Sequence, residues 1–263
     1  MKVPFYKLHG AGNDILVIES KFLPKKGKSK WIQRFASRQL GVGADQVMEV
    51  TQKNPLEFFV WNGDGTRAEM CANGSRVLLY LSHLLGWSRG KKIPFSIGRK
   101  NFVGYRISKE IFEISLGAPK IYGNESISTS LGSVPFFRVS VGNPHAVIFS
   151  ETLPPFSFRE LGKEIEHHSA FPQRTNVEFI RSWEKKGSRI KALVEVWERG
   201  AGATLSCGSG AVAVARVLKE KSGLSHFHIQ MNQFVLKVRF EGEEAFLSGP
   251  STLVAKGDYL SSL

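Results

Sequence analysis

The chain contains two cysteines, Cys71 and Cys207, and the same local pattern surrounds both of them. In residues 61–71, and again in residues 197–207, a Trp stands ten positions before the Cys and a polar side chain nine positions before it. A Gly follows three positions after each Cys. A repeated pattern of this kind is typical of an internal duplication, which constrains the chain to fold as two similar halves.

The spacing of other polar residues supports the duplication. Asn13 and Gln46 are 33 positions apart, and so are Asn143 and Asn176. The next interval, up to the cysteine, is 25 positions in the first half and 31 in the second. The additional residues fit a longer hairpin around residues 185–187. Because these matches occur in the same order, we expect two homologous halves.

Hydrophobic periodicity predicts a similar order of elements in both halves. Strands are predicted at residues 3–8, 14–19, 45–51, 56–61, 93–97, 101–107, 111–116, 134–141, 145–149, 174–182, 190–196, 234–240 and 252–256. A helix with Ser29 as its N-cap is predicted at residues 29–40 from the spacing of Trp31, Phe35 and Leu40, and a polar helix is predicted at residues 157–168. The segments 73–85 and 209–221 are apolar on nearly every side, which is typical of buried helices.

We therefore expect an α/β (α+β) fold of two pseudo-symmetric domains. Each would be a curved, mostly antiparallel sheet wrapped around a central buried helix, with the active site in the cleft between the domains. The first domain would comprise residues 1–116 and 251–263 and carry Cys71. The second would comprise residues 117–250 and carry Cys207. The tail joins the first domain because that half lacks one strand.

Composition narrows the class of protein. The chain has no run of 18 apolar residues that could span a membrane, and its first residues lack the apolar segment of a signal peptide. Two cysteines do not form a disulfide framework, so we expect reduced thiols in the cytoplasm. The formal net charge of +13 would suit a nucleic-acid partner. The basic residues fall in short scattered groups without interleaved aromatics, which favours a solvated basic surface instead.

Each cysteine stands at the predicted start of a buried helix. The free N–H groups and the dipole at that end favour negative charge, so we expect the thiol pKa to be lowered from its usual value of about 8.5. The same N–H groups can hold a carboxylate. Two acid–base groups on opposite sides of one carbon are suited to inverting its configuration. Such a reaction requires no organic cofactor.

Other interpretations of the cysteines explain less of the sequence. A Cys–His hydrolase could use His145, but the second cysteine would then have no role. A zinc site is not indicated, because there is no close pair of cysteines and the histidines at 167, 168, 226 and 228 fit surface or strand positions. Residues 41–43 are a weak match to a dinucleotide-binding loop.

Seven segments resemble the motifs of the diaminopimelate epimerase family. They are residues 9–14, 41–46, 62–65, 70–74, 142–145, 174–179 and 197–210. They occur in the family's order over nearly the whole chain. The resemblance implies a pyridoxal-phosphate-independent isomerase without a metal, a cytoplasmic homodimer that converts LL- to meso-diaminopimelate for lysine and peptidoglycan synthesis.

The resemblance also implies which groups carry the chemistry. Cys71 and Cys207 would be the catalytic acid–bases. His145 and Glu198 would lie near them and tune their pKa values. Glu198 would also lie near the reacting amino group of the substrate.

The remaining candidates would bind the substrate. Backbone N–H groups would hold the reacting carboxylate, and they belong to Ala72, Asn73, Gly208 and Ser209. Two amides, Asn13 and Gln46, would line the reacting end. The distal amino-acid end would be bound by Asn62, Asn143, Asn176 and Arg199. An Arg can pair with a carboxylate through two parallel hydrogen bonds, and an Asn can both donate and accept.

Three positions depart from the family's pattern. Ala72 stands where Gly is common, Ser209 where Thr is common, and Ala203 where a polar residue is common. These departures leave open a racemase or epimerase of another amino acid on the same scaffold. A non-catalytic, basic nucleic-acid-binding protein is a third hypothesis, from a different class.

Overall fold

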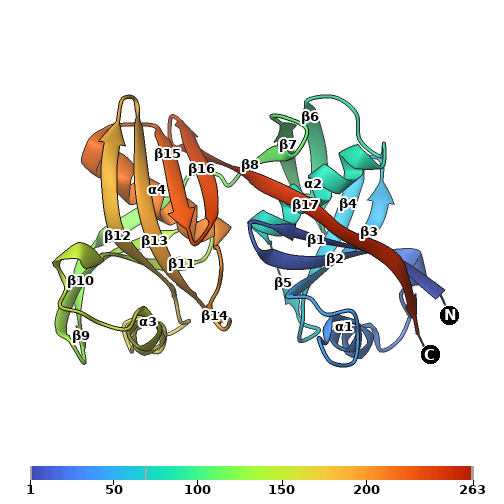
Figure 1. Cartoon of the computed structure of the whole chain (residues 1–263), viewed down its shortest axis with the longest axis horizontal. Coiled ribbons are helices and arrows are strands. Elements are labelled where there is room, and N and C mark those ends of the chain that lie inside the picture. The colour runs from blue at the N-terminus through green and yellow to red at the C-terminus, as the bar shows by residue number, and fades with distance from the viewer. Residues whose placement is uncertain (1, 69, 262–263) are drawn as a thin grey trace. The chain divides into compact units, whose positions relative to one another are not determined.

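The computed structural model describes residues 2–68 and 70–261. The chain folds into two compact units, drawn in Figure 1. Unit 1 comprises Met1–Ile114 and Ser248–Leu263, and unit 2 comprises Ser115–Leu247. The sequence places the corresponding divisions after residues 116 and 250, so the two sets of boundaries differ by two or three residues.

Unit 1 is a sheet that closes on itself around one apolar helix. Its helices are η1 (Ser20–Phe22), α1 (Lys28–Ala36) and α2 (Ala72–Leu84). Its strands are β1 (Lys2–Gly10), β2 (Asn13–Glu19), β3 (Gln46–Lys53), β4 (Leu56–Asn62), β5 (Arg67–Ala68), β6 (Lys92–Ile97), β7 (Lys100–Arg106), β8 (Ile111–Ser115) and the C-terminal part of β17 (Glu244–Leu260). The pairs β2–β3 and β4–β6 are parallel. Because β17 pairs with both β1 and β8, the sheet has no free edge there.

Unit 2 repeats this order of elements. Its helices are η2 (Ser150–Thr152), α3 (Phe158–Glu166) and α4 (Gly208–Ser222). Its strands are β9 (Lys120–Thr129), β10 (Gly132–Ser140), β11 (Pro144–Phe149), β12 (Asn176–Lys186), β13 (Arg189–Glu198), β14 (Gly202–Ala203), β15 (His226–Met231), β16 (Phe234–Glu241) and the N-terminal part of β17. The pairs β11–β12 and β13–β15 are parallel, as are their counterparts in unit 1.

The duplication extends to the details of strand pairing. In unit 1 the β3–β4 ladder shifts register between Val50 and Gln52, and in unit 2 the β12–β13 ladder shifts between Ile180 and Ser182. Each unit also has one strand that pairs antiparallel with the first strand of the repeated order, which is β1 in unit 1 and β10 in unit 2. The end of β17 pairs with β1 in the way that β9 pairs with β10. The predicted class, two duplicated halves that each wrap a sheet around a helix, is confirmed.

The start and end of α1 were predicted wrongly. The N-cap is Gly27 rather than Ser29, and the Ser29 hydroxyl instead donates to the Gly65 carbonyl at 2.8 Å. The helix ends at Ala36, so Leu40 lies outside it and is 68% exposed. The backbone N–H groups of residues 42–44 bond to the last carbonyls of the helix, which turns the chain back.

Strand β9 has no counterpart among the predicted strands. Its residues are mostly exposed, and its apolar side chains do not alternate regularly. Its partner β10 supplies the pairing that makes it a strand. A strand held mainly by such backbone contacts leaves little hydrophobic pattern to detect.

The two central helices are buried as expected. Residues 77–79 of α2 and residues 211–215 of α4 are fully enclosed by their sheets. Burying a Val or Leu side chain stabilises the folded state by roughly 1.5–3 kcal/mol, so these helices anchor their units. None of the helices among the described residues is long and apolar enough to cross a membrane.

Candidate active site

Cys71 occupies the N-cap position of α2. Its backbone is extended, and its sulfur accepts a hydrogen bond from the Gly74 backbone N–H at 3.1 Å. A Cβ on Gly74 would lie 1.7 Å from the Met48 methyl and 3.3 Å from the Cys71 sulfur, so a side chain would crowd this turn. The sulfur therefore lies where the helix N–H groups favour negative charge.

Three amide side chains form a row of polar contacts that begins at the Cys71 sulfur. The Asn13 amide nitrogen lies 3.4 Å from Cys71 Sγ and 3.4 Å from Gln46 Oε1. The Gln46 amide in turn donates to Asn62 Oδ1 at 3.4 Å. Pairing of β3 with its neighbours explains this, because Gln46 lies opposite Ile15 on β2 and opposite Asn62 on β4.

Unit 1 thus brings together all of its candidate site residues. Ala72 and Asn73 form the first turn of α2, directly after Cys71. The Asn73 side chain is buried and accepts a hydrogen bond from Arg76 at 2.8 Å. Their backbone N–H groups belong to the helix terminus, where a carboxylate can be held.

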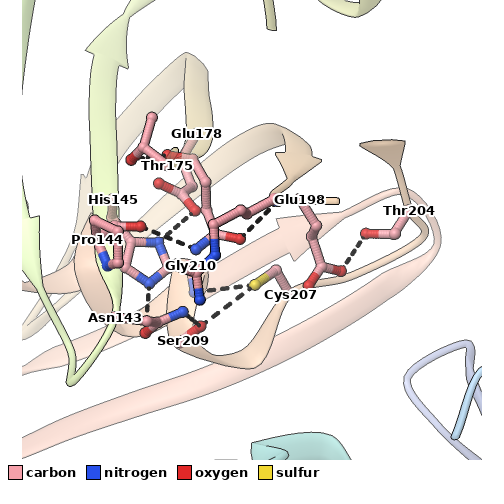
Figure 2. Close-up of polar contacts among 12 residues, drawn as sticks. Asn143, Pro144, His145, Thr175, Glu178, Glu198, Thr204, Cys207, Ser209 and Gly210 are labelled. Carbon is pink, nitrogen blue, oxygen red and sulfur yellow. Dashed lines mark hydrogen bonds and ion pairs between the residues drawn. The ribbon is translucent and has the colours of Figure 1, made fainter. Parts of the chain in front are cut away.

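Cys207 occupies the matching N-cap position of α4 in unit 2 (Figure 2). Its sulfur accepts a hydrogen bond from the Gly210 backbone N–H at 3.4 Å and lies 3.5 Å from the Ser209 hydroxyl. The residue is only 4% exposed, whereas Cys71 is partly exposed. The two thiols therefore share a helix position but differ in their surroundings.

A polar chain extends from Ser209 to a buried carboxylate. The Asn143 amide donates to the Ser209 hydroxyl at 3.4 Å, and Asn143 Oδ1 lies 3.1 Å from His145 Nε2. The other ring nitrogen, His145 Nδ1, lies 2.7 Å from Glu178 Oε1. Figure 2 shows these side chains converging on the start of α4. His145 and Glu178 are both fully buried.

Glu198, the last residue of β13, contacts Cys207 at the start of α4. The Thr204 hydroxyl donates to Glu198 Oε1. Burial raises the pKa of Glu198, and the Glu178 charge adds to this, while hydrogen bonds from Thr204 and Cys207 oppose it. Glu198 therefore holds its proton to higher pH than an exposed glutamate does.

The expected direction of the Cys207 pKa is wrong. Burial raises the pKa of the Cys207 thiol well above its usual range, and the charges of Glu198 and Glu178 raise it further. Hydrogen bonds from Ser209 and Gly210 lower the thiol pKa, but by less than burial and the two carboxylates raise it. A helix N-terminus lowers a thiol pKa only when desolvation and neighbouring carboxylates do not outweigh it.

Asn176 and Arg199 are connected through the backbone. The Asn176 amide donates to the Pro144 carbonyl at 2.9 Å, and its oxygen accepts from the Arg199 backbone N–H at 3.0 Å. The Arg199 guanidinium is exposed and donates to the Gln173 carbonyl at 3.3 Å. The structure therefore brings the Arg199 backbone, but not its charged group, into the network around Asn176.

Sequence reasoning missed several residues that shape these sites. Glu178 and Arg76 are buried charges near the two cysteines. Glu178 stands between apolar residues of β12, and Arg76 directly precedes the apolar residues 77–79 of α2, which is the signal that could have found them. Two further buried carboxylates accept hydrogen bonds from the tryptophans of the repeated pattern. The Trp61 indole donates to Glu49 at 2.8 Å and the Trp197 indole to Glu166 at 2.7 Å.

Within the described residues, no three His, Cys, Asp or Glu side chains gather as metal ligands would. Each of the two helix ends offers a thiol with N–H donors beside it. A thiol can take or return a proton, and the N–H donors can bind a carboxylate.

A sequence profile of the family described as diaminopimelate epimerase matches residues 5–95 and 137–254. These ranges include both cysteine segments and most of the chain. The chain belongs to the diaminopimelate epimerase family. It is therefore confirmed as an enzyme of the isomerase class, an epimerase.

Diaminopimelate epimerases of several organisms resemble this chain over nearly its whole length. The enzyme of Acaryochloris marina is 34% identical over 98% of this chain and 99% of its own length. The enzyme of Halothermothrix orenii is 31% identical over 98% of each.

Solved structures of other proteins share the fold. A phenazine biosynthesis protein of the PhzF family from Bacillus anthracis has a TM-score of 0.75 at 12% identity and covers 99% of this chain and 100% of its own. A probable proline racemase from Agrobacterium radiobacter has a TM-score of 0.71 at 12% identity, covering 99% and 93%. At this identity the likeness concerns the fold alone.

Proposed function

We propose that this chain epimerises LL-2,6-diaminopimelate to the meso form, with one cysteine removing the α-proton and the other returning a proton on the opposite face. Diaminopimelate epimerases that are 31–34% identical over nearly their full length support the substrate. One observation carries the mechanism. The central helix of each duplicated unit begins at a cysteine whose sulfur accepts a hydrogen bond from that helix's own N–H.

The first step breaks the Cα–H bond of the substrate. A thiolate takes the proton, and the electron pair of the bond remains on the α-carbon and delocalises into the adjacent carboxylate. The N–H groups of Ala72, Asn73, Gly208 and Ser209 would stabilise the charge that develops there. Helix N-termini suit this role because their N–H groups have no partner within the helix.

The second step forms a new Cα–H bond on the other face. The opposing thiol gives its proton to the carbanion and becomes the thiolate, so the two cysteines exchange protonation states in each turnover. Neither step oxidises or reduces the substrate, so the reaction balances without an organic cofactor. The product can leave only after its carboxylate is released from the helix termini.

The other candidate residues would select the substrate. Asn13 and Gln46 would line the reacting end, and Glu198 would lie near its amino group. The distal end would be bound by Asn62, Asn143, Asn176 and Arg199. The Arg199 guanidinium, now on the Gln173 carbonyl, would have to turn toward that distal carboxylate. Unpaired polar groups in this subsite would reject amino acids that lack a second amino-acid end.

The biological setting is part of the same proposal. We expect the enzyme to act as a homodimer in the cytoplasm, on the route to lysine and peptidoglycan. Sedimentation of the purified protein at micromolar concentration would test the oligomeric state. A mass corresponding to one 29.3 kDa chain would contradict the dimer.

The direct test of the activity is turnover of LL-diaminopimelate by the purified protein without added cofactor. The meso isomer is expected as the product, and Cys71→Ala or Cys207→Ala should each lower the rate by at least about 10³-fold. Full activity in either variant would contradict the two-cysteine mechanism.

A panel of other amino acids, including proline and lysine, separates this proposal from a racemase of different specificity. Preferred turnover of a substrate without a distal stereocentre would favour that alternative. Ala72, whose methyl group stands where the family commonly has Gly, would then be the first residue to examine. A basic nucleic-acid-binding role would instead show steeply salt-dependent binding that is unaffected by the Cys71→Ala, Cys207→Ala double variant.

A further inference from the structure

The central helix of unit 1 carries a fully buried arginine, Arg76. One guanidinium nitrogen donates to Asn73 Oδ1 at 2.8 Å, and another donates to the Ala72 carbonyl at 3.4 Å. The Arg76 Nε has no hydrogen-bond partner among the described residues. Burying a cation with incomplete hydrogen bonding is costly, so some compensating charge is expected nearby.

Cys71, when ionised, supplies a charge of this kind. Burial lowers the pKa of Arg76 to about 10, and the negative charge of Cys71 acts in the opposite direction and favours the cation. Coulomb attraction is mutual, so the guanidinium favours the thiolate of Cys71 to the same extent. Cys71 stands five positions before Arg76 and caps the same helix.

Unit 2 has no such cation at the corresponding position. Five positions after Cys207 stands Val212, which is fully buried among apolar residues. Cys207 instead lies near Glu178 and Glu198, whose charges disfavour its thiolate. Among the described residues, the duplication thus gives each cysteine the same helix terminus but places a buried guanidinium near Cys71 and two carboxylates near Cys207.

A second pair of positions shows the same asymmetry. A Cβ on Gly74 would meet the Met48 methyl at 1.7 Å, and a Cβ on Gly210 would meet Glu178 Oε1 at 2.6 Å. Met48 and Glu178 therefore approach equivalent glycines of α2 and α4, one with an apolar group and the other with a carboxylate. Of these two glycines, only Gly210 has a carboxylate against it among the described residues.

We propose that Arg76 is a positioning residue that keeps Cys71 as the thiolate of the resting enzyme, while Cys207 rests as the thiol. The guanidinium acts through charge on Cys71 and through its hydrogen bonds to Asn73 and Ala72, which fix the first turn of α2. This inference rests on the proposed two-cysteine function. It predicts that the free enzyme is prepared to remove a proton with Cys71 and to return one with Cys207.

Alkylation of Cys71 by iodoacetamide measures its thiolate without requiring turnover, because the thiolate is the reacting form. The rate is followed against pH by mass spectrometry in a Cys207→Ser background, so that one thiol remains. The groups that face Cys71 include the Asn13 amide and the Gly74 N–H, neither of which titrates. Glu69, two positions before Cys71, lies outside the described residues, and a Glu69→Gln variant measures its contribution separately.

Arg76→Gln keeps a polar side chain but removes the charge. We expect it to slow alkylation at pH 7 by at least about tenfold and to move the pH profile upward. Arg76→Lys, which retains a positive charge, should restore part of the rate. The matched control is Arg216→Gln, the same change on α4, which should leave the Cys71 profile unchanged.

The resting assignment has a second readout that does not depend on Arg76 variants folding. The ultraviolet absorbance of a thiolate at neutral pH should be lost in Cys71→Ala and retained in Cys207→Ala. A Cys71 profile unchanged by Arg76→Gln, or a thiolate located on Cys207, would overturn the inference. Either result leaves the proposed function intact. Full epimerase activity in Cys71→Ala or Cys207→Ala would instead overturn the two-cysteine mechanism, and absence of epimerase activity in the unmodified protein would overturn the function itself.

Discussion

Glu178 shows how one side chain can distinguish two copies of the same structure. It is fully buried, contacts His145 Nδ1 at 2.7 Å, and contributes a charge that raises the pKa of Cys207. The internal duplication identified Asn13, Gln46 and Asn62, because polar residues recur at similar spacing before both cysteines. Glu178 and Arg76 could not be found in this way, since the other half has Met48 and Val212 at those positions.

Replacing Glu178 by Gln is therefore expected to lower the pKa of Cys207. The variant removes a negative charge near the sulfur but can still accept a hydrogen bond from His145. Alkylation of Cys207, measured in a Cys71→Ser background, should shift to lower pH relative to the same protein with Glu178. A profile that stays in place or moves upward would show that this carboxylate does not act on Cys207.

The raised pKa of Glu198 predicts how the unfolding free energy of the protein changes with pH. A carboxyl whose pKa is raised by folding binds its proton more tightly in the folded state. The stability that it contributes is complete below the unfolded value of about 4.5 and is lost as pH rises through the folded value. Glu198→Gln cannot ionise, so its stability relative to the unmodified protein should increase between about pH 4 and about pH 7.

Urea unfolding of the two proteins at each pH measures this difference. The prediction concerns the change with pH rather than the absolute value, because the substitution also alters the hydrogen bond from Thr204. A difference in unfolding free energy that is the same at both pH values would contradict the raised pKa.

At the level of elements, the central helices could be predicted and the end of α1 could not. Residues 77–79 are apolar on consecutive positions, which identifies a buried helix without tertiary information. The end of α1 depends on residues 42–44 folding back onto its last carbonyls. Gly41 permits this turn, because a Cβ there would lie 2.1 Å from the Arg34 carbonyl oxygen and 2.4 Å from that of Phe35.

Gly41→Ala should therefore destabilise unit 1. The clash is with backbone atoms, which cannot move aside as a flexible side chain does, so we expect a loss of about 1–3 kcal/mol in unfolding free energy. Gly123→Ala on β9 is the matched control, since its nearest contact would be an ordinary 3.8 Å. Equal stability of the two variants in urea would contradict the packing described for this turn.

For the whole molecule, the duplication was readable from residue spacing, and the closing role of the C-terminal strand was suggested by a strand count alone. The structure pairs the tail with β1 over residues 251–260. The tail also reaches α1, where Trp31 donates to Ser261 Oγ at 3.1 Å and the Tyr259 ring lies 5.1 Å from that of Phe35. These contacts join residues more than 200 positions apart, which no local pattern reveals.

A chain that ends at Pro250 should lose structure in one unit first. Without its partner, β1 loses a ladder of hydrogen bonds and α1 loses the aromatic contacts of Tyr259. Hydrogen exchange is expected to show lost protection in β1 and α1, while α4 remains protected. Equal loss in both units would mean that they do not unfold separately.

The central claim is that two cysteines on two duplicated helices act on one carbon from opposite sides. Turnover of LL-diaminopimelate in D₂O tests it most directly. The account predicts that early meso product carries deuterium at the inverted carbon, because the returning thiol has exchanged with solvent, while recovered substrate remains mostly unlabelled. Rapid incorporation of deuterium into the recovered substrate would indicate a single exchanging base and would contradict the account.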